Sequence, residues 1–388
     1  MGHCQPVPPA VSVNHAFAAR IGVFHLQIKT LSIRATQCHS GFKRATLTLH
    51  PRYVLMVKVA INGFGRTGRL ALRAAIERGS KLEFVAVNRG DAKQLGHLLK
   101  YDSVHGRAPF PVEVEGDVIV AAGKKIKVLN ESDAEKLPWA ALGVDLVIDS
   151  SDKYRDRDSA TKHLKAGAKK VLVGAPGKRL DATIVIGVND DVYDPAKHNL
   201  VSNASCTTNC VAPVVKVLND NYGIESAMVT TIHAYTSTQM ILDRADKDLR
   251  RSRAAAMNII PTTTGMTSAI GEVLPELKGK VDGMAFRVPT PDVSLIDVST
   301  ILREKPRADA INDSFKKAAE GKMKGILGYE CDPLVSADFL HCPYSTVVDG
   351  CSTISNGSMV KVVAWYDNEF GYSCRTVELA ERMAKSLR

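Results

Sequence analysis

The stretch VKVAINGFGRTGRLALRAAIERGSKLEFVAV, residues 57–87, decides the fold class. An apolar run, VKVAIN, leads into a glycine-rich loop, then into a stretch with the apolar spacing of a helix, and then into a second apolar run. Two short apolar runs joined by a helix are typical of a βαβ unit with parallel strands. We therefore expect an α/β fold that begins at about residue 56.

The glycine loop has the spacing G-x-G-x-x-G, with Gly63, Gly65 and Gly68. Glycine allows a tight turn and a close approach to a pyrophosphate, which then lies at a helix N-terminus where amide donors favour negative charge. The pattern also occurs in loops that only pack, but the strand before it and the helix after it favour a dinucleotide site. Arg66, inside the loop, is a candidate phosphate contact.

Downstream, the pattern changes near residue 225. Apolar runs at 144–150, 169–174, 183–188 and 199–205, with a helical pattern at 158–168, predict a mostly parallel, doubly wound sheet. Long β-branched stretches at 228–236, 284–302 and 359–367 predict a mixed, largely antiparallel sheet, with helices near 267–277 and 308–320. An amphipathic helix is expected at 375–388.

The length of 388 residues suits about two domains. We expect a Rossmann dinucleotide-binding domain at 56–205 and an α+β catalytic domain at 206–370, followed by a C-terminal helix at 371–388 that packs back on the Rossmann domain.

Residues 1–55 stand apart in composition. They contain six Lys or Arg, no acid and five of the eleven His. One interpretation is an organelle transit peptide, and the other, slightly favoured, is a misplaced start upstream of Met56. Either way we expect an extension outside the fold. It accounts for +6 of the net charge of +10, which leaves too little basicity elsewhere to make a nucleic acid the first expected ligand.

Eight cysteines are scattered without CxxC pairs, which favours a reducing compartment over a disulfide scaffold. The apolar runs are too short for a membrane span, so we expect a soluble protein with no membrane partner. The expected location is the cytoplasm, or a plastid or another organelle if residues 1–55 are a transit peptide.

Cys206 lies where an apolar strand, ending in SNAS, meets a helical pattern. A helix N-terminus stabilises thiolate over thiol and is expected to lower the pKa of this cysteine, as a nucleophile requires. Cys210 has the spacing of a metal pair but lacks further ligands, so a buried thiol is favoured and no metal site is expected. His233 is a candidate base, although a lone strand histidine is more often structural.

Two other places suit anions. The basic cluster Lys247, Arg250, Arg251 and Arg253 would ordinarily be a solvated face, but it precedes the turn PTTTG at 261–265, which opens a helix. Arg287 lies inside an apolar strand, where an unpaired charge is costly and an anionic ligand would compensate it.

The second strand ends in VNRG, without the acid that an NAD-specific site places there for the ribose. Arg89 has the geometry to meet the additional phosphate of NADP; the alternative is a solvated loop arginine.

The segment NASCTTNC resembles the phosphorylating (type I) glyceraldehyde-3-phosphate dehydrogenase family, and so do INGFGRTGR, KYDSVHG, HAYT, AFRVPTP, GILGYE and WYDNEFGYS across residues 56–388. The resemblance implies a glycolytic oxidoreductase that converts D-glyceraldehyde 3-phosphate and inorganic phosphate to 1,3-bisphosphoglycerate with NAD or NADP. It also implies a homotetramer, in which the loop at about 235–259 lies against a neighbour's cofactor, and a last helix that packs back on the Rossmann domain.

By the same resemblance, Cys206 is the nucleophile that forms a hemithioacetal and then a thioester, and His233 is the base. The substrate phosphate would be bound by Thr236 and Arg287. The attacking phosphate would be bound by Ser205, Thr207, Arg250, Thr264 and Gly265. The cofactor would contact Gly63, Phe64, Gly65, Arg66, Thr67, Gly68, Arg89, Ser151, Asn368 and Tyr372.

The sequence departs from the family pattern in four places. Arg89 replaces the usual acid, Arg244–Ala245 replaces Leu-Pro, Gly174 replaces Ser or Thr, and Asp152 replaces a glycine without a physical explanation. The first two changes favour use of NADP, alone or beside NAD. A relative that oxidises erythrose 4-phosphate is the alternative enzyme, and a basic protein that binds RNA through the dinucleotide cleft is the alternative of another class.

Overall fold

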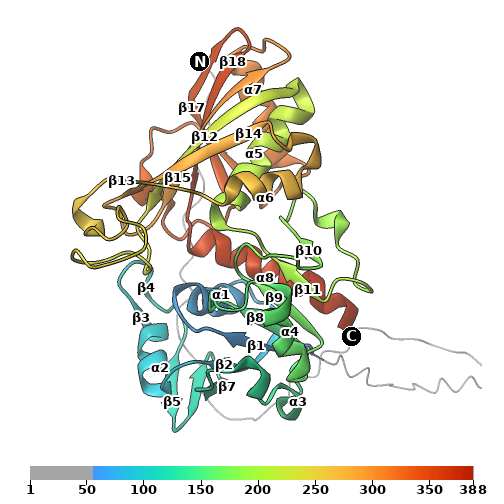
Figure 1. Cartoon of the computed structure of the whole chain (residues 1–388), viewed down its shortest axis with the longest axis vertical. Coiled ribbons are helices and arrows are strands. Elements are labelled where there is room, and N and C mark those ends of the chain that lie inside the picture. The colour runs from blue at the N-terminus through green and yellow to red at the C-terminus, as the bar shows by residue number, and fades with distance from the viewer. Residues whose placement is uncertain (1–55, 388) are drawn as a thin grey trace, which may run out of the picture. The chain divides into compact units, whose positions relative to one another are not determined.

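The computed structural model describes residues 56–387, and the expectations for residues 1–55 lie outside this range. Two large sheets, each with its own hydrophobic core, dominate the described residues, and a small third sheet pairs β3 (Tyr101–Asp102) with β4 (Gly106–Arg107) (Figure 1). The predicted fold class, a Rossmann domain with an α+β catalytic domain, is confirmed. The exact domain boundaries stay predictions.

The first sheet has nine strands in the order β10-β11-β9-β8-β1-β2-β7-β6-β5. Its parallel part comprises β1 (Lys58–Asn62), β2 (Glu83–Asn88), β7 (Lys124–Leu129), β8 (Leu146–Asp149), β9 (Lys170–Val173), β10 (Ala182–Thr183) and β11 (Leu200–Ser202). The strands β5 (Val112–Glu115) and β6 (Val118–Ala121) extend it in antiparallel fashion. Its helices include α1 (Arg66–Glu77), α2 (Ala92–Lys100), α3 (Trp139–Leu142) and α4 (Arg157–Lys165).

The strand expected at 183–188 is wrong beyond Thr183. Gly187 has a φ of +83°, which turns the chain. The Asn189 side chain holds this turn, because its Oδ1 accepts from the Val185 N–H at 2.8 Å and its Nδ2 donates to the Thr183 carbonyl at 3.0 Å. An asparagine that bonds nearby backbone groups in this way competes with strand pairing.

The second sheet has seven strands in the order β13-β14-β12-β15-β18-β17-β16. They are β12 (Ile224–Ala234), β13 (Ile260–Thr262), β14 (Val281–Val288), β15 (Ser294–Leu302), β16 (Leu327–Glu330), β17 (Thr346–Asn356) and β18 (Met359–Tyr366). Only the pairs β12–β14 and β16–β17 are parallel, so the sheet is mixed and largely antiparallel, as predicted.

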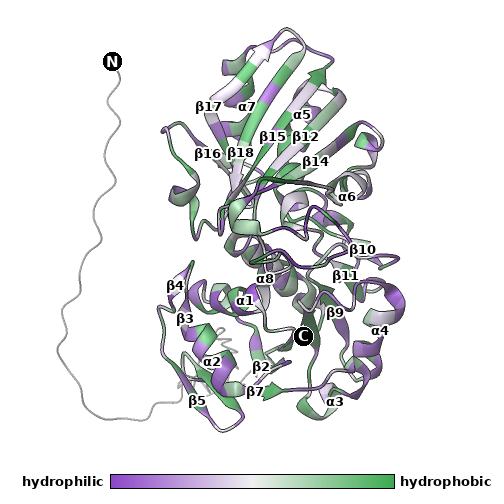
Figure 2. Ribbon diagram, turned by 60° about the vertical axis from the view of Figure 1, so that its left-hand side comes forward, coloured by the Kyte–Doolittle hydropathy of each residue, from purple (hydrophilic) through white to green (hydrophobic). Residues whose placement is uncertain are grey.

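One face of this sheet is covered by α5 (Cys206–Tyr222), α6 (Met266–Val273) and α7 (Ala308–Glu320). Buried and partly exposed residues alternate strictly along β15, as expected where one face of a strand is covered by helices. Figure 2 shows the hydrophobic segments along β12, β15 and β18.

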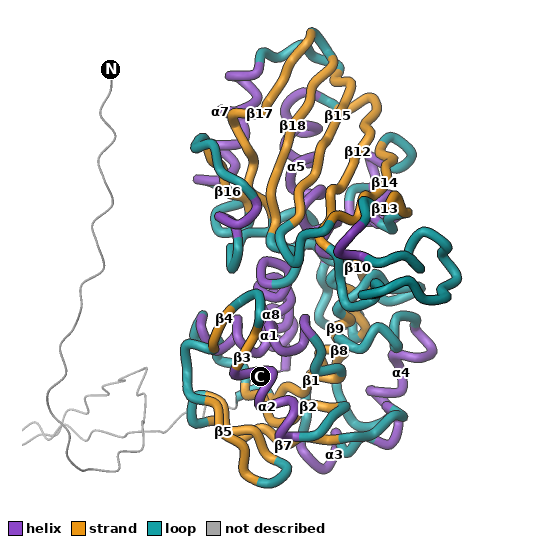
Figure 3. The backbone as a smooth tube through the Cα atoms, turned by 90° about the vertical axis from the view of Figure 1, so that its left-hand side faces the viewer, coloured by secondary structure: helices purple, strands orange, loops and turns teal. Residues whose placement is uncertain are grey.

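Helix α8 (Phe370–Ala384) follows β18 directly and begins five residues before the amphipathic pattern at 375–388. Its apolar residues Phe370, Val377 and Met383 belong to the core of the nine-stranded sheet. The chain therefore returns from the second sheet to the first through this helix, which lies beside α1 (Figure 3). Within residues 56–387, no helix combines the length and apolar character needed to span a membrane.

Candidate active site

Cys206 is the first residue of α5. Ser205 caps this helix, and its Oγ accepts from the Thr208 N–H at 3.0 Å. Ala204, just before the cap, has a φ of +54°, and its carbonyl accepts from the Tyr372 hydroxyl at 3.0 Å. The strand, the strained residue and the cap together place the Cys206 sulfur at the start of the helix, as expected from the sequence.

His233, near the end of β12, faces this sulfur. Its Nε2 lies 3.5 Å from Cys206 Sγ. Its Nδ1 lies 2.7 Å from the Ala234 carbonyl oxygen, which can only accept, and 2.9 Å from Arg287 Nη1, which can only donate. In the tautomer that carries its hydrogen on Nδ1, Nε2 is free to take a proton from the thiol. The ring also packs edge-on against Tyr366, with centroids 5.9 Å apart.

The thiol and the imidazole are both neutral in the free protein. Burial raises the pKa of Cys206, and neither Arg287 nor the backbone N–H groups at the helix start offset it. The expectation of a lowered cysteine pKa is therefore wrong for the free protein. Burial, with the positive charge of Arg287, lowers the pKa of His233 to about 3. His233 thus remains an unprotonated base at neutral pH.

Arg287 on β14 is paired in register with His233 on β12. Its Nη1 donates to the Ala234 carbonyl at 2.9 Å. Its Nε is buried and has no hydrogen-bond partner among the described residues. A buried guanidinium with an unused donor, beside the reactive sulfur, suits an anionic ligand.

The predicted phosphate residues Thr236, Thr264 and Gly265 lie in the turns around this centre. Thr236 Oγ1 is 2.9 Å from Thr238 Oγ1, and Gly265 is the N-cap of α6, so free helix donors lie beside Thr264. Thr207 is buried, and its hydroxyl is 3.1 Å from that of Tyr366.

Of the basic cluster, Arg251 is the arginine that contacts the PTTTG turn. Its Nε donates to Thr262 Oγ1 at 2.9 Å, and its charge acts on both His233 and Arg287. Arg250 is exposed, and its side chain makes no hydrogen bond with the residues that the structure describes. Adjacent arginines in a loop cannot be told apart by spacing, and these contacts favour Arg251 over the predicted Arg250 as the candidate.

The glycine loop forms a cradle at the N-terminus of α1. Gly63 has a φ of +91°, and a Cβ there would lie 2.6 Å from the backbone of Ser151. A Cβ on Gly68 would lie 2.3 Å from the Gly63 carbonyl oxygen, whereas one on Gly65 would meet open space. The loop is therefore tightly packed at Gly63 and Gly68 and open to solvent at Gly65, which fits a pyrophosphate bound at the start of the helix. Phe64 is buried in the core, and Thr67 lies in the first turn of α1.

Other cofactor residues lie around the same sheet edge. Ser151 donates through its N–H and Oγ to Asp149 Oδ1, at 3.1 and 2.8 Å. Asn368 is buried, and its Oδ1 accepts from the Ser294 hydroxyl at 2.6 Å, which leaves its amide nitrogen free to donate. Arg89 ends β2 with a φ of +80°, is exposed, and makes no side-chain hydrogen bond with residues 56–387. The next acid, Asp91, is used as the N-cap of α2.

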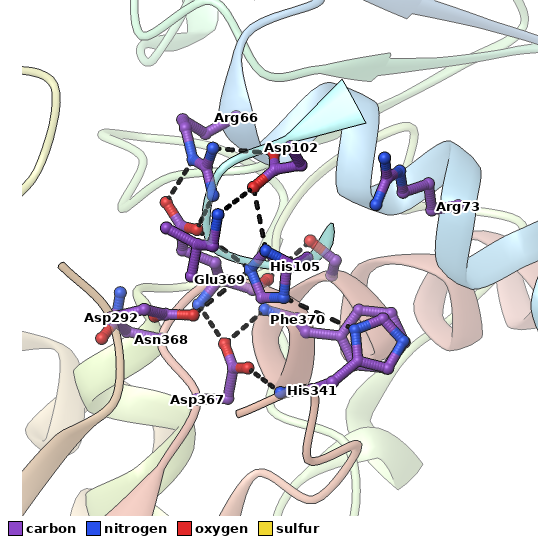
Figure 4. A network of polar contacts seen from close by, with 12 residues as sticks. Arg66, Arg73, Asp102, His105, Asp292, His341, Asp367, Asn368, Glu369 and Phe370 are labelled. Atoms are coloured by element: carbon purple, nitrogen blue, oxygen red, sulfur yellow. Dashed lines mark hydrogen bonds and ion pairs between the residues drawn. The ribbon is translucent and has the colours of Figure 1, made fainter. Parts of the chain in front are cut away.

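Arg66 does not offer a free guanidinium to a phosphate. Its Nε donates to Glu369 at 2.7 Å, and its Nη1 to Asp102 at 2.8 Å (Figure 4). Two carboxylates therefore neutralise its charge, and only its backbone N–H, at the start of α1, remains for the pyrophosphate. The side chain instead ties the glycine loop to the segment that carries Asn368.

A buried polar network surrounds Asn368 on both sides. His105 Nε2 lies 3.1 Å from Glu369 and 3.2 Å from Asp292, although neither Asp292 oxygen takes a well-directed hydrogen bond. Asp367 accepts the backbone N–H groups of His341, Glu369 and Phe370, at 2.7, 2.9 and 2.6 Å. The network was not predicted from the sequence, because its members are separated by up to 264 positions.

We expect His105→Gln to destabilise the protein most at low pH. Burial acts against the charged imidazole, but the nearby carboxylates of Asp292, Glu369 and Asp367 outweigh it and raise the pKa of His105 to about 10. An imidazole in the unfolded chain titrates near ~6.5. The stabilisation, on the order of a few kcal/mol, is complete below about pH 6.5 and is lost as the pH rises toward 10. Urea unfolding of the unchanged chain and the variant at pH 6, 8 and 10 measures their free energies of unfolding. A difference between the two proteins that is the same at all three pH values would contradict this role of His105.

Two family models match the chain: the glyceraldehyde 3-phosphate dehydrogenase NAD-binding domain over residues 57–157, and the C-terminal domain of the same enzyme over residues 205–368. Among curated proteins, the glyceraldehyde-3-phosphate dehydrogenase of Geobacillus stearothermophilus is 54% identical over 332 residues, which cover 85% of this chain and 99% of the relative. This chain belongs to the glyceraldehyde-3-phosphate dehydrogenase family. Glyceraldehyde-3-phosphate dehydrogenase 1 of Bacillus subtilis is also 54% identical, over 333 residues, with 85% and 99% covered.

Membership in the glyceraldehyde-3-phosphate dehydrogenase family makes the chain an oxidoreductase with an NAD-binding domain. The resemblance found in the sequence is confirmed, and so are the NAD-binding and catalytic domains that it implied. The roles of the individual residues, the choice between NAD and NADP, and the assembly are taken up as proposals below.

Proposed function

We propose that the chain oxidises D-glyceraldehyde 3-phosphate to 1,3-bisphosphoglycerate, with a thioester on Cys206 as the intermediate. The observation that carries this is the 3.5 Å contact between Cys206 Sγ at the start of α5 and Nε2 of His233. A nucleophile, an adjacent base and a flanking arginine are the parts that thioester chemistry requires.

In the first step, Sγ attacks the aldehyde carbon while Nε2 of His233 takes the thiol proton and passes it to the carbonyl oxygen. This gives a hemithioacetal and returns His233 to its neutral form. Nε2 then accepts the hydroxyl proton as the thioester forms. The bound nicotinamide supplies the acceptor for the hydrogen that leaves the carbon. A phosphate oxygen finally attacks the thioester carbon, and the departing sulfur regains its proton from His233.

Two anion sites serve these steps. Arg287, with its unused Nε donor, and Thr236 bind the phosphate of the substrate. Arg251, Thr264 and Gly265 bind the attacking phosphate near the start of α6. Ser205 and Thr207 flank Cys206 and complete this second site.

We expect Arg251→Ala to raise the KM for inorganic phosphate by about tenfold or more, because a charge-assisted bond to phosphate contributes about 1.5–3 kcal/mol. Arg250→Ala is the matched control and is expected to leave this KM within about twofold, since its side chain is exposed. Steady-state rates at varied phosphate test both variants, and the opposite pattern would assign the site to Arg250.

The family supports NAD binding, and we propose that the chain uses NADP, alone or beside NAD. Arg89 lies exposed at the end of β2, where the ribose of a bound cofactor belongs, and its guanidinium is uncommitted among the described residues. A planar guanidinium matches a phosphate with paired donors.

Arg89→Asp is expected to lower the ratio of kcat/KM for NADP to that for NAD by about tenfold or more, because it replaces attraction for a phosphate with repulsion. The measurement compares both cofactors at saturating substrate. An NADP preference that survives the substitution rules out this role of Arg89. The melting temperature of the variant serves as the control for folding.

The reaction itself is tested by assays with glyceraldehyde 3-phosphate, with phosphate present or omitted. Loss of turnover without phosphate supports the acyl phosphate product, whereas sustained turnover with erythrose 4-phosphate and without phosphate would favour the alternative enzyme. RNA binding by the dinucleotide cleft is the second alternative, and a lack of any fast-reacting thiol toward iodoacetate would favour it.

We also propose a homotetramer in the cytoplasm. The segment between β12 and β13 exposes Ile241, Leu249, Met257 and Ile259, with 88, 81, 80 and 68% of each residue accessible. So many exposed apolar residues in one segment are typical of a subunit interface. Sedimentation at micromolar concentration tests the assembly.

A further inference from the structure

Two exposed cysteines, Cys331 and Cys351, lie at adjacent strands and take no part in the proposed reaction at Cys206. Cys331 follows β16, and Cys351 lies within β17. These strands are parallel neighbours, with Glu330 opposite Asp349, so Cys331 comes next to Gly350, the residue that precedes Cys351. Both cysteines are free thiols, and both are exposed.

Both cysteines lie close to Gly350. Cys351 Sγ lies 2.8 Å from the carbonyl oxygen of Cys331, and Cys331 Sγ lies 3.5 Å from the Tyr329 hydroxyl. A Cβ on Gly350 would lie 2.0 Å from that same hydroxyl oxygen. The glycine therefore leaves space for the tyrosine hydroxyl beside the Cys331 thiol, and the Cys351 thiol lies against the backbone of Cys331.

We propose that Cys331 and Cys351 are a redox-active thiol pair that forms a reversible disulfide with a low-molecular-weight disulfide as the oxidant. One thiolate attacks a sulfur of the oxidant, forms a mixed disulfide and releases one thiol. The second protein thiolate attacks the protein sulfur of that mixed disulfide and releases the second thiol. Two protein thiols are oxidised, and one oxidant disulfide is reduced.

The surroundings favour this pair over the other described cysteines. Cys210 and Cys374 are buried, and burial raises the pKa of Cys374 to about 12, so neither sulfur is open to an oxidant. A surface hollow of about 430 Å³ between α7 and β16, lined by Lys316, Tyr329 and Cys331 among others, gives a small disulfide access to Cys331. The neighbouring second thiol then resolves the mixed disulfide faster than a dissolved thiol can.

The bond would close the segment 331–351 into a covalent loop. This segment carries His341, whose N–H bonds Asp367 and whose Nε2 lies 2.8 Å from Glu77 of α1. The disulfide would therefore restrict the motion of a segment that contacts α1 and the residue after β18, and it would not involve Cys206.

The experiment uses the full chain with Cys206→Ser, so that the reactive thiol at the active site cannot compete. After incubation with oxidised glutathione, peptides are mapped by mass spectrometry without reduction. We expect a Cys331–Cys351 linked peptide that exceeds either single glutathione adduct by about tenfold. Dithiothreitol should remove the link.

Two further variants on the same background separate the proposal from general reactivity. Cys351→Ser is expected to leave a stable glutathione adduct on Cys331 and no link. Cys342→Ser, which changes a half-buried thiol on the same segment, should form the link unchanged. Separate adducts at Cys331 and Cys351 without a link, or no reaction at either residue, would overturn the proposal.

Discussion

Replacing Cys206 with serine should abolish turnover, with a loss of about four orders of magnitude or more. Serine keeps the helix start but presents a hydroxyl, whose proton is held far more tightly than that of a thiol, so no acyl intermediate can form at a useful rate. The nearby Nε2 cannot compensate, because burial and Arg287 lower the pKa of His233 to about 3 and make it a weak base. The assay is the steady-state oxidation of glyceraldehyde 3-phosphate.

Cys210→Ser is the matched control for this variant. Cys210 lies one turn along the same helix, is buried, and donates to Thr346 Oγ1 at 3.3 Å, a contact that serine can reproduce. We expect turnover within about threefold of the unchanged chain. A comparable loss in both variants would mean that helix α5, and not the sulfur at position 206, limits the reaction.

His233→Asn should lower kcat/KM by about 10²–10⁴-fold at pH 7, the usual contribution of a positioned base. The variant also has a distinctive pH dependence. With the folded pKa of His233 near 3, the unchanged chain keeps its base unprotonated from about pH 4 upward, so lowering the pH from 7 to 5 should not remove catalysis through this group. Without the base, only thiolate can react.

Burial raises the pKa of Cys206, so the thiolate fraction in the His233→Asn variant grows with pH throughout the neutral range. Its rate should then rise about tenfold per pH unit, and the deficit should shrink toward high pH. Measuring kcat/KM from pH 6 to 9 for both proteins tests this. Parallel pH profiles would show that His233 orients groups but does not accept the proton.

Local patterns in the sequence predicted the type of both sheets and part of their strands, but not β5, β6, β7, β16 and β17. The apolar runs around the glycine loop predicted β1, α1 and β2, and the helix expected at 308–320 matches α7. Short-range signals failed where one side chain decides the local structure, as Asn189 does in the turn that replaces an expected strand. The amphipathic pattern missed the start of α8 because its first residues, Phe370 to Cys374, belong to a motif without clear helical periodicity.

The sequence predicted which residues meet at the site, but it did not predict their charge states. The residues Cys206 and His233 were identified from residue type and position, and the structure brings them within 3.5 Å. The charge states could not be predicted, since they depend on burial and on Arg287, which arrives from a different strand. The sequence analysis placed the Arg66 side chain at a phosphate because its partner could not be foreseen. Glu369, which accepts a hydrogen bond from Arg66 Nε, lies 303 positions away in the sequence.

Helix α8 has a consequence for how the chain is made. The core of the first sheet is completed by residues of α8, which are synthesised only after the whole of the second sheet. The nascent nucleotide-binding half therefore keeps an uncovered apolar surface until α8 has been made. Shortening the chain at its carboxyl end should harm the part of the molecule encoded first.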